Sequence, residues 1–185
     1  QVNLTRFNLQ FPEKREFFLE GVGIFSFGGA GLNARGAQTT APILFFSRAI
    51  GVSQGRAVPI QAGGRLTGKA GKYSLGALNI QTSDDPAIGA RETNFSVFRL
   101  KRDVLRRSYL GVIATRRAPA SGSTDQNLTM GLDAGFSFFG NVNLNTYYAR
   151  TDTPGASGDQ SSYRGQLDYG SDRYGLQVDH LLVGD

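Results

Sequence analysis

Three glutamates near the N-terminus are the residues best suited to acid–base chemistry. Glu13, Glu16 and Glu20 fall within one short stretch, and two carboxylates roughly 5–10 Å apart serve as the acid and base of a glycoside hydrolase. Lys14 and Arg15 lie among them, so the carboxylates can instead pair with cations and fix the segment in place. We favour ion pairing for this N-terminal charged cluster (Glu13, Lys14, Arg15 and Glu16) and expect no catalytic residues. Later cations that offer partners are Arg65, Lys69, Arg99 and Lys101.

Residues that bind metals are sparse. The chain has no cysteine and one histidine, His180, so a typical zinc site cannot form. The polarity pattern puts His180 on an apolar strand face, which argues against a Ser-His-Asp triad. We therefore expect no metal and no cofactor. Four loop aspartates lack the spacing of a calcium loop: Asp84, Asp85, Asp152 and Asp159.

The bulk composition narrows the class of protein. The 185 residues carry a net charge of +5, but the basic residues are dispersed outside Arg99–Arg107, so we expect no nucleic-acid partner. No run of about 18 apolar residues occurs, which excludes a transmembrane helix. A hydrophobic share of 39% does not exclude a membrane β-barrel, because its strands need apolar residues only at alternate positions.

Alternating polarity predicts antiparallel β-strands along most of the chain. The clearest pair is Asn127–Phe138 and Val142–Thr151, joined by the tight turn Phe139-Gly140-Asn141. Most of the nine predicted segments have about 9–11 residues, the length that crosses a tilted bilayer. They are Pro42–Ile50, Pro59–Lys69, Tyr73–Thr82, Asn94–Arg102, Ser108–Arg117, Asn127–Phe138, Val142–Thr151, Ser161–Gly170 and Tyr174–Gly184.

The predicted connections alternate between short and long. Tight turns at 70–72, 139–141 and 171–173 are separated by long Gly-, Pro-, Ser- and Asp-rich connections such as 118–126 and 152–160. This alternation is typical of an antiparallel up-and-down transmembrane barrel, with short periplasmic turns and long external loops. Because nine strands cannot close such a barrel, we expect more strands after Asp185.

The two faces of the predicted strands differ in polarity. A half-exposed soluble sheet shows the same alternation, so a soluble β-sandwich binding module is an alternative. Two segments, Tyr73–Thr82 and Asn94–Arg102, do not alternate cleanly, which a β-bulge or a packed plug can explain. We predict as lumen-facing polar residues Arg65, Lys69, Asp133, Asn143, Arg164 and Asp168. We predict as lipid-facing or aromatic-girdle residues Leu128, Met130, Leu132, Phe136, Phe138, Tyr169 and Tyr174.

Several phrases of the sequence resemble one family of Gram-negative outer-membrane proteins. The phrases are NLTRF (3–7), FPEKREFFLEG (11–21), FFSRAIG (45–51), LTGKAGKYSLGALN (66–79) and YGLQVDHLLVGD (174–185). In that family a β-barrel domain of unknown function follows a family-9-type carbohydrate-binding module. The resemblance implies an outer-membrane location and a module before Gln1. It provides no catalytic residues.

Together these observations predict a plug-like segment, residues 1–41, and an incomplete barrel, residues 42–185. The expected function is porin- or receptor-like passage, or surface anchoring, linked to carbohydrate capture by the absent module. A carbohydrate-active hydrolase that uses the glutamates is an alternative. Membrane lipid is the expected partner, and lipopolysaccharide phosphates can pair with arginines near the long loops, although simple solvation explains these side chains equally well. They are Arg91, Arg116, Arg117 and Arg150.

Overall fold

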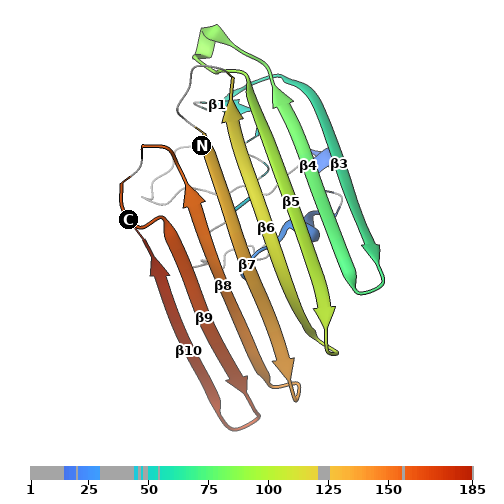
Figure 1. Ribbon diagram of the computed structural model, residues 1–185. Coiled ribbons are helices and arrows are strands. Elements are labelled where there is room, and N and C mark those ends of the chain that lie inside the picture. The colour runs from blue at the N-terminus through green and yellow to red at the C-terminus, as the bar shows by residue number, and fades with distance from the viewer. Residues whose placement is uncertain are drawn as a thin grey trace.

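One antiparallel sheet of eight strands dominates the computed structural model (Figure 1). The structure describes residues 15–19, 21–29, 44, 45, 47, 50–53, 55–120, 126–155 and 157–184. The strands follow one another in sequence order across the sheet, which confirms the predicted all-β, antiparallel, up-and-down arrangement. They are β3 (Ile60–Ala70), β4 (Tyr73–Thr82), β5 (Thr93–Val104), β6 (Ser108–Pro119), β7 (Asn127–Phe138), β8 (Val142–Asp152), β9 (Ser161–Gly170) and β10 (Gly175–Val183).

The remaining described elements are short. Two of them, helix α1 (Glu16–Leu19) and the 3-10 turn η1 (Val22–Phe25), belong to the N-terminal segment. The strands β1 (Val52–Ser53) and β2 (Arg56–Ala57) form a small hairpin, and η3 (Pro86–Ile88) lies between β4 and β5. Among the described residues, no helix is long and apolar enough to span a membrane.

The predicted strand Pro42–Ile50 is wrong. Its described residues are Leu44, Phe45, Ser47 and Ile50, and none of them lies in a strand. The carbonyl groups of Ser47 and Ile50 accept hydrogen bonds from the Arg15 guanidinium at 2.8 and 2.9 Å, so a side chain takes the place of a strand partner. The count of nine strands, and the argument from it for further strands, therefore does not hold for the described residues.

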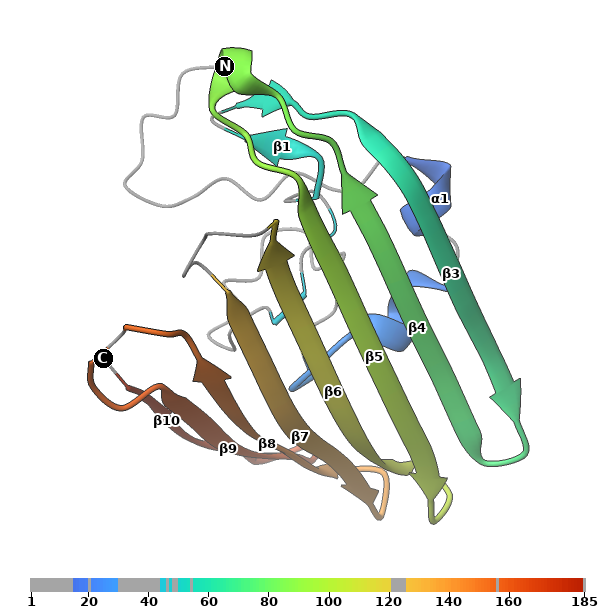
Figure 2. The same ribbon diagram turned by 45° about the horizontal axis from the view of Figure 1, so that its top comes forward.

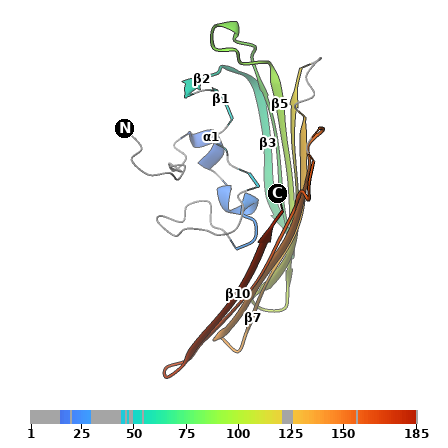
Figure 3. The same ribbon diagram turned by 90° about the vertical axis from the view of Figure 1, so that its left-hand side faces the viewer.

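The sheet is curved, and the N-terminal elements lie on its concave side (Figures 2 and 3). The connections at one end are tight, as between β7 and β8, whereas those at the other end are long, as between β8 and β9. Strands β3 and β10 form the two edges of the sheet. The N-terminal elements therefore cover part of the concave face, and neither edge strand pairs on its outer side with another described strand.

The hydrophobic core lies between the concave face and the N-terminal segment. Leu78 and Ile80 of β4 belong to it, and so does Val97 of β5. Pairing between β4 and β5 is continuous, without a register shift. Packing of the N-terminal segment, not a β-bulge, thus explains why these two strands do not alternate cleanly. Other core residues are Phe18, Phe25, Phe27, Phe45, Ile50, Ile113, Tyr147 and Ala149.

On the opposite, convex face, the same two strands carry amides near their long-loop end. The Asn79 Nδ2 atom lies 3.0 Å from Asn94 Oδ1 and 2.8 Å from Ser96 Oγ. Asn94 Nδ2 also donates to Gln81 Oε1 at 2.9 Å. These polar side chains lie on the face of β4 and β5 that points away from the core, and hydrogen bonds between the two strands satisfy them.

Candidate functional site: the concave face of the sheet

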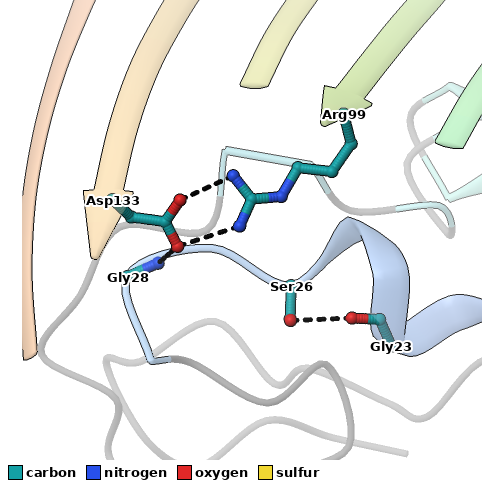
Figure 4. Close-up of polar contacts among 5 residues, drawn as sticks. All are labelled: Gly23, Ser26, Gly28, Arg99 and Asp133. Atoms are coloured by element: carbon teal, nitrogen blue, oxygen red, sulfur yellow. Dashed lines mark hydrogen bonds and ion pairs between the residues drawn. The ribbon is translucent and has the colours of Figure 1, made fainter. Parts of the chain in front are cut away.

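A buried ion pair lies near the middle of the concave face. Arg99 of β5 contacts Asp133 of β7 through two parallel hydrogen bonds, Nη1–Oδ1 at 2.6 Å and Nη2–Oδ2 at 2.9 Å. Both side chains are 0% exposed, and bidentate pairing is the strong geometry for guanidinium and carboxylate. The backbone N–H of Gly28 donates to Asp133 Oδ2 at 3.1 Å (Figure 4). The pair therefore joins two strands to the N-terminal segment.

Three inward-facing glycines, Gly76, Gly111 and Gly131, provide room for these contacts, and we call them the glycine seats. A Cβ atom at Gly111 would lie 2.6 Å from Asp133 Oδ1 and 2.8 Å from Arg99 Nη1. At Gly131 it would lie 2.6 Å from Phe27 Cζ, and at Gly76 it would lie 2.9 Å from a ring carbon of Phe25. A larger side chain at Gly111 meets the ion pair, and one at Gly76 or Gly131 meets the packed N-terminal segment.

Aromatic contacts hold the N-terminal segment between the glycine seats. The Phe27 ring lies 5.4 Å from the Tyr147 ring, and the Arg99 guanidinium lies 5.7 Å from the Phe27 ring centroid. The Ser26 hydroxyl donates to the Gly23 carbonyl at 2.8 Å and stabilises the turn that precedes Phe27 (Figure 4). The described part of this segment is thus anchored by both apolar burial and hydrogen bonds.

The N-terminal charged cluster is described only in part. Arg15 donates to backbone carbonyls, as described above, and stacks 4.2 Å from the Phe18 ring centroid, whereas Glu16 is exposed. Glu13, Lys14 and Glu20 lie outside the described residues. Arg99, which we expected as a possible partner for these glutamates, pairs with Asp133 instead. The two are inward-facing side chains of β5 and β7, the strands on either side of β6, and they meet over Gly111 of β6.

The other half of the concave face, on strands β8 to β10, is polar toward the short-turn end, whereas Leu181 and Val183 of β10 add apolar side chains toward the long loops. In one row of the register, Asn143 lies opposite Asp168, which lies opposite Gln177. A groove of about 510 Å³ at the short-turn end is lined by these three residues among others. The next row contains Asn145, Gln166 and Asp179. We call the six residues of these two rows the polar strip: Asn143, Asn145, Gln166, Asp168, Gln177 and Asp179.

A second ion pair belongs to this half. Arg164 Nε donates to Asp179 Oδ1 at 2.8 Å, and their side chains are 13% and 32% exposed. On the far edge, Lys69 Nζ lies 2.8 Å from Asp103 Oδ2, also in an exposed position. Also in β3, Arg65 donates to the backbone carbonyl of Phe17. Several charges of the concave face are thus matched by partners nearby.

The register places all the predicted polar residues on the concave face. Two of them, Asp133 and Arg65, contact the N-terminal segment. Whether this face lines a lumen stays a prediction. The six residues concerned are Arg65, Lys69, Asp133, Asn143, Arg164 and Asp168.

The convex face carries exposed apolar side chains on strands from β3 to β10. Contiguous apolar patches of more than a few hundred Å² are rare on soluble monomers. Residues of this band that are between 38% and 61% exposed include Leu66, Phe98, Leu110, Met130, Leu132, Tyr148, Tyr163, Leu176 and Val178. The predicted lipid-facing residues Leu128, Met130, Leu132, Phe136, Phe138 and Tyr169 share this face, and exposed Tyr174 lies in the turn before β10. Contact of the band with lipid stays a prediction.

The remaining candidates for chemistry are dispersed. The His180 ring lies on the convex face, 5.7 Å from the Tyr163 ring. The carboxylates of Asp85 and Asp159 accept hydrogen bonds from nearby backbone amides in their loops, whereas Asp84 and Asp152 are exposed. Within the described ranges, no group of three or more His, Asp or Glu residues is arranged to hold a metal ion.

The main anchoring contact was not predicted from the sequence. Alternation placed Asp133 on the inward face, but the segment around Arg99 lacks clean alternation, so the pairing of Arg99 with Asp133 was not expected. One available signal was Gly111, whose missing side chain permits a contact across β6. No protein-family model, curated protein or solved structure matches the chain.

Proposed function

We propose that the chain forms part of a Gram-negative outer-membrane β-barrel and mediates porin- or receptor-like passage, or surface anchoring. The observation that carries this proposal is the sorting of the two faces. One face exposes an apolar band across the sheet, and the other combines an anchored segment with a polar strip. Contact of the apolar band with water is unfavourable, and lipid on the convex side would remove this contact.

Strand length and the sheet edges support a barrel. The eight strands have 9 to 12 residues, close to the 9–11 that cross a tilted bilayer. Edges as long as β3 and β10 invite pairing with other chains. Closure of the sheet, either by further strands or by pairing of these two edges, removes both edges at once.

The polar strip supports passage of hydrophilic solutes. The N-terminal segment occupies the concave face over β4 to β8, and the strip on β8 to β10 presents amides and carboxylates beside it. A solute that follows the strip exchanges hydrogen bonds with water for hydrogen bonds with these side chains. The proposed route therefore runs along the strip, beside the N-terminal segment.

The proposed partners are membrane lipid, lipopolysaccharide and, through a module outside this chain, a glycan. Among the arginines considered for lipopolysaccharide, Arg116 and Arg150 share the convex face with the apolar band, whereas Arg117 is on the concave face. Arg91 lies in the connection before β5. Of these four arginines, only Arg116 and Arg150 therefore have backbone positions suited to a lipid that lies against the convex face.

Gel migration and conductance test this function together. We expect the purified chain to require detergent, to migrate differently on a denaturing gel before and after heating, and to conduct ions in planar bilayers. A soluble β-sandwich would stay monomeric without detergent and would not insert into vesicles, and that result would contradict the proposal. Insertion without conductance would favour anchoring over passage.

A further inference from the structure

A groove of about 690 Å³ crosses the convex face within the apolar band. Its floor consists of Ala134, Thr146 and Gly165, which are opposite one another on β7, β8 and β9. Tyr148 and Tyr163, one row nearer the long loops, form its side. The floor residues are small, and the flanking residues include the two tyrosines, Leu132 and His180, so the groove has room for one narrow, mostly apolar chain.

Two exposed arginines lie between this groove and the long loops. Arg150 follows Tyr148 by two residues on the same face of β8, and Arg116 lies on the convex face of β6. Neither arginine forms an ion pair with another described residue. Asp152, opposite Leu128 in the row of Arg116, is the nearest acidic side chain on that face. The surface formed by Arg116, Arg150 and Asp152 therefore has a net positive charge.

The spacing of the arginines is wide. Arg116 is opposite Leu128, and Arg150 is opposite Met130, so the two lie two strands and one row apart. With about 4.8 Å between strands and about 3.3 Å of rise per residue, their backbones are roughly 12 Å apart. Extended arginine side chains at this separation can converge on one phosphate, but two phosphates at opposite ends of a disaccharide give each guanidinium group a partner of its own.

We infer that the groove and the two arginines form a binding site for the lipid anchor of lipopolysaccharide. One phosphate pairs with Arg116 and the other with Arg150, and one acyl chain passes Tyr148 into the groove over Gly165. Charge-assisted hydrogen bonds fix the headgroup, and burial of the acyl chain adds apolar stabilisation. This inference rests on the proposed function, because it requires the convex face to lie in a membrane.

Lipid binding by the purified chain in non-ionic detergent, counted by native mass spectrometry, tests the site. The probes are lipid A, the same lipid A after removal of both phosphates, and phosphatidylglycerol. We expect lipid A to bind at least about tenfold more tightly than its dephosphorylated form, since a hydrogen bond to a charged group contributes about 1.5–3 kcal/mol. The double variant R116Q/R150Q should lose this preference.

Matched variants distinguish the contribution of the lipid headgroup to binding from that of the acyl chain. R106Q/R107Q removes the same charge from exposed positions in the turn at the opposite end of the sheet and should bind lipid A as the parent does. Gly165→Leu fills the groove and should weaken both forms of lipid A several-fold. Gly68→Leu adds the same side chain to the convex face of β3, where a Cβ also meets nothing within 4 Å, and should leave binding unchanged.

Each alternative result has a distinct meaning. Equal binding of lipid A and its dephosphorylated form by an inserted, heat-modifiable protein overturns the inference but leaves the proposed function standing. Phosphatidylglycerol binding as tight as that of lipid A, with the same loss in R116Q/R150Q, overturns the lipopolysaccharide assignment in favour of a general anionic-lipid site. A chain that neither inserts into vesicles nor shows heat-modifiable migration overturns both.

Discussion

The two halves of the concave face have the same strand geometry but opposite contents. Under the N-terminal segment, side chains such as Ile80 and Ile113 are only 1–2% exposed. On the polar strip, Asn143 and Asp168 line an open groove. The strands pair continuously from one half to the other. The comparison shows that alternation assigns residues to a face, whereas side-chain size and polarity along the face determine what can cover it.

The two ion pairs make the comparison quantitative. Arg99 and Asp133 are completely excluded from solvent, whereas Arg164 and Asp179 keep part of their side chains exposed. Water and salt screen the second pair but not the first. Removal of one partner of an ion pair should therefore lower the free energy of unfolding by very different amounts in the two halves.

The largest expected effect is that of Asp133→Asn. The amide keeps the size of the carboxylate and can still accept from Gly28, but it leaves the buried Arg99 charge unpaired. Loss of one partner of a buried pair costs about 3–5 kcal/mol, so the free energy of unfolding in detergent should fall by that amount. Urea titration followed by heat-modifiable gel migration measures it. The control Asp179→Asn, in the exposed pair, should cost less than about 1 kcal/mol, and equal losses would contradict the contrast between the halves.

An intermediate effect is expected from Gly131→Ala. The added Cβ lies 2.6 Å from Phe27 Cζ, so the ring or the strand must move. Overpacking of this kind costs about 1–3 kcal/mol, measured by the same titration. Limited proteolysis should also cut the N-terminal segment faster, because its anchor is displaced. Gly68→Ala adds a methyl group where nothing lies within 4 Å and should change stability by no more than about 0.5 kcal/mol. A similar loss in both variants would show that Gly131 is not a seat for the segment.

Much of the sheet could be predicted from the sequence because alternation is a local signal. The strand Asn127–Phe138 and its neighbour after Phe139-Gly140-Asn141 needed only period-two polarity and a turn residue with a left-handed backbone, here Gly140 with φ of 82°. The sharing of one face by residues as distant as Arg65 and Asp168 follows from the same signal once the strands are paired.

The N-terminal layer could not be predicted in the same way. Its contacts are long-range, as between Gly28 and Asp133, and no local period encodes them. The apolar residues Phe45 and Ile50 suggested a strand, but their side chains pack in the core, and the Arg15 guanidinium donates to the carbonyls of Ser47 and Ile50. Non-local packing overrode local β-propensity there. The irregular polar and apolar pattern of β4 was a sign in the sequence that another segment packs on this strand.

The smallest expected effect concerns ion preference and tests the polar strip directly. Asp168 lines the open groove beside Asn143 and Gln177, and no described residue forms an ion pair with it. In a wet passage, one carboxylate about 8 Å away lowers the energy of a passing cation by about 0.5 kcal/mol and raises that of an anion by about as much, a difference of about 1 kcal/mol. Asp168→Asn should therefore reduce the preference for cations over anions by less than about fivefold, with unfolding unchanged.

The reversal potential across a planar bilayer with a tenfold salt gradient measures this preference. Asp103→Asn is the matched control, because its carboxylate is also on the concave face but pairs with Lys69 at the β3 edge of the sheet, far from the strip. We expect it to leave the reversal potential close to that of the parent, and high salt to reduce the effect of Asp168→Asn, since screening shortens the reach of an exposed charge. If both variants shift the potential equally, ions do not follow the strip, and the concave face of β8 to β10 is not the route.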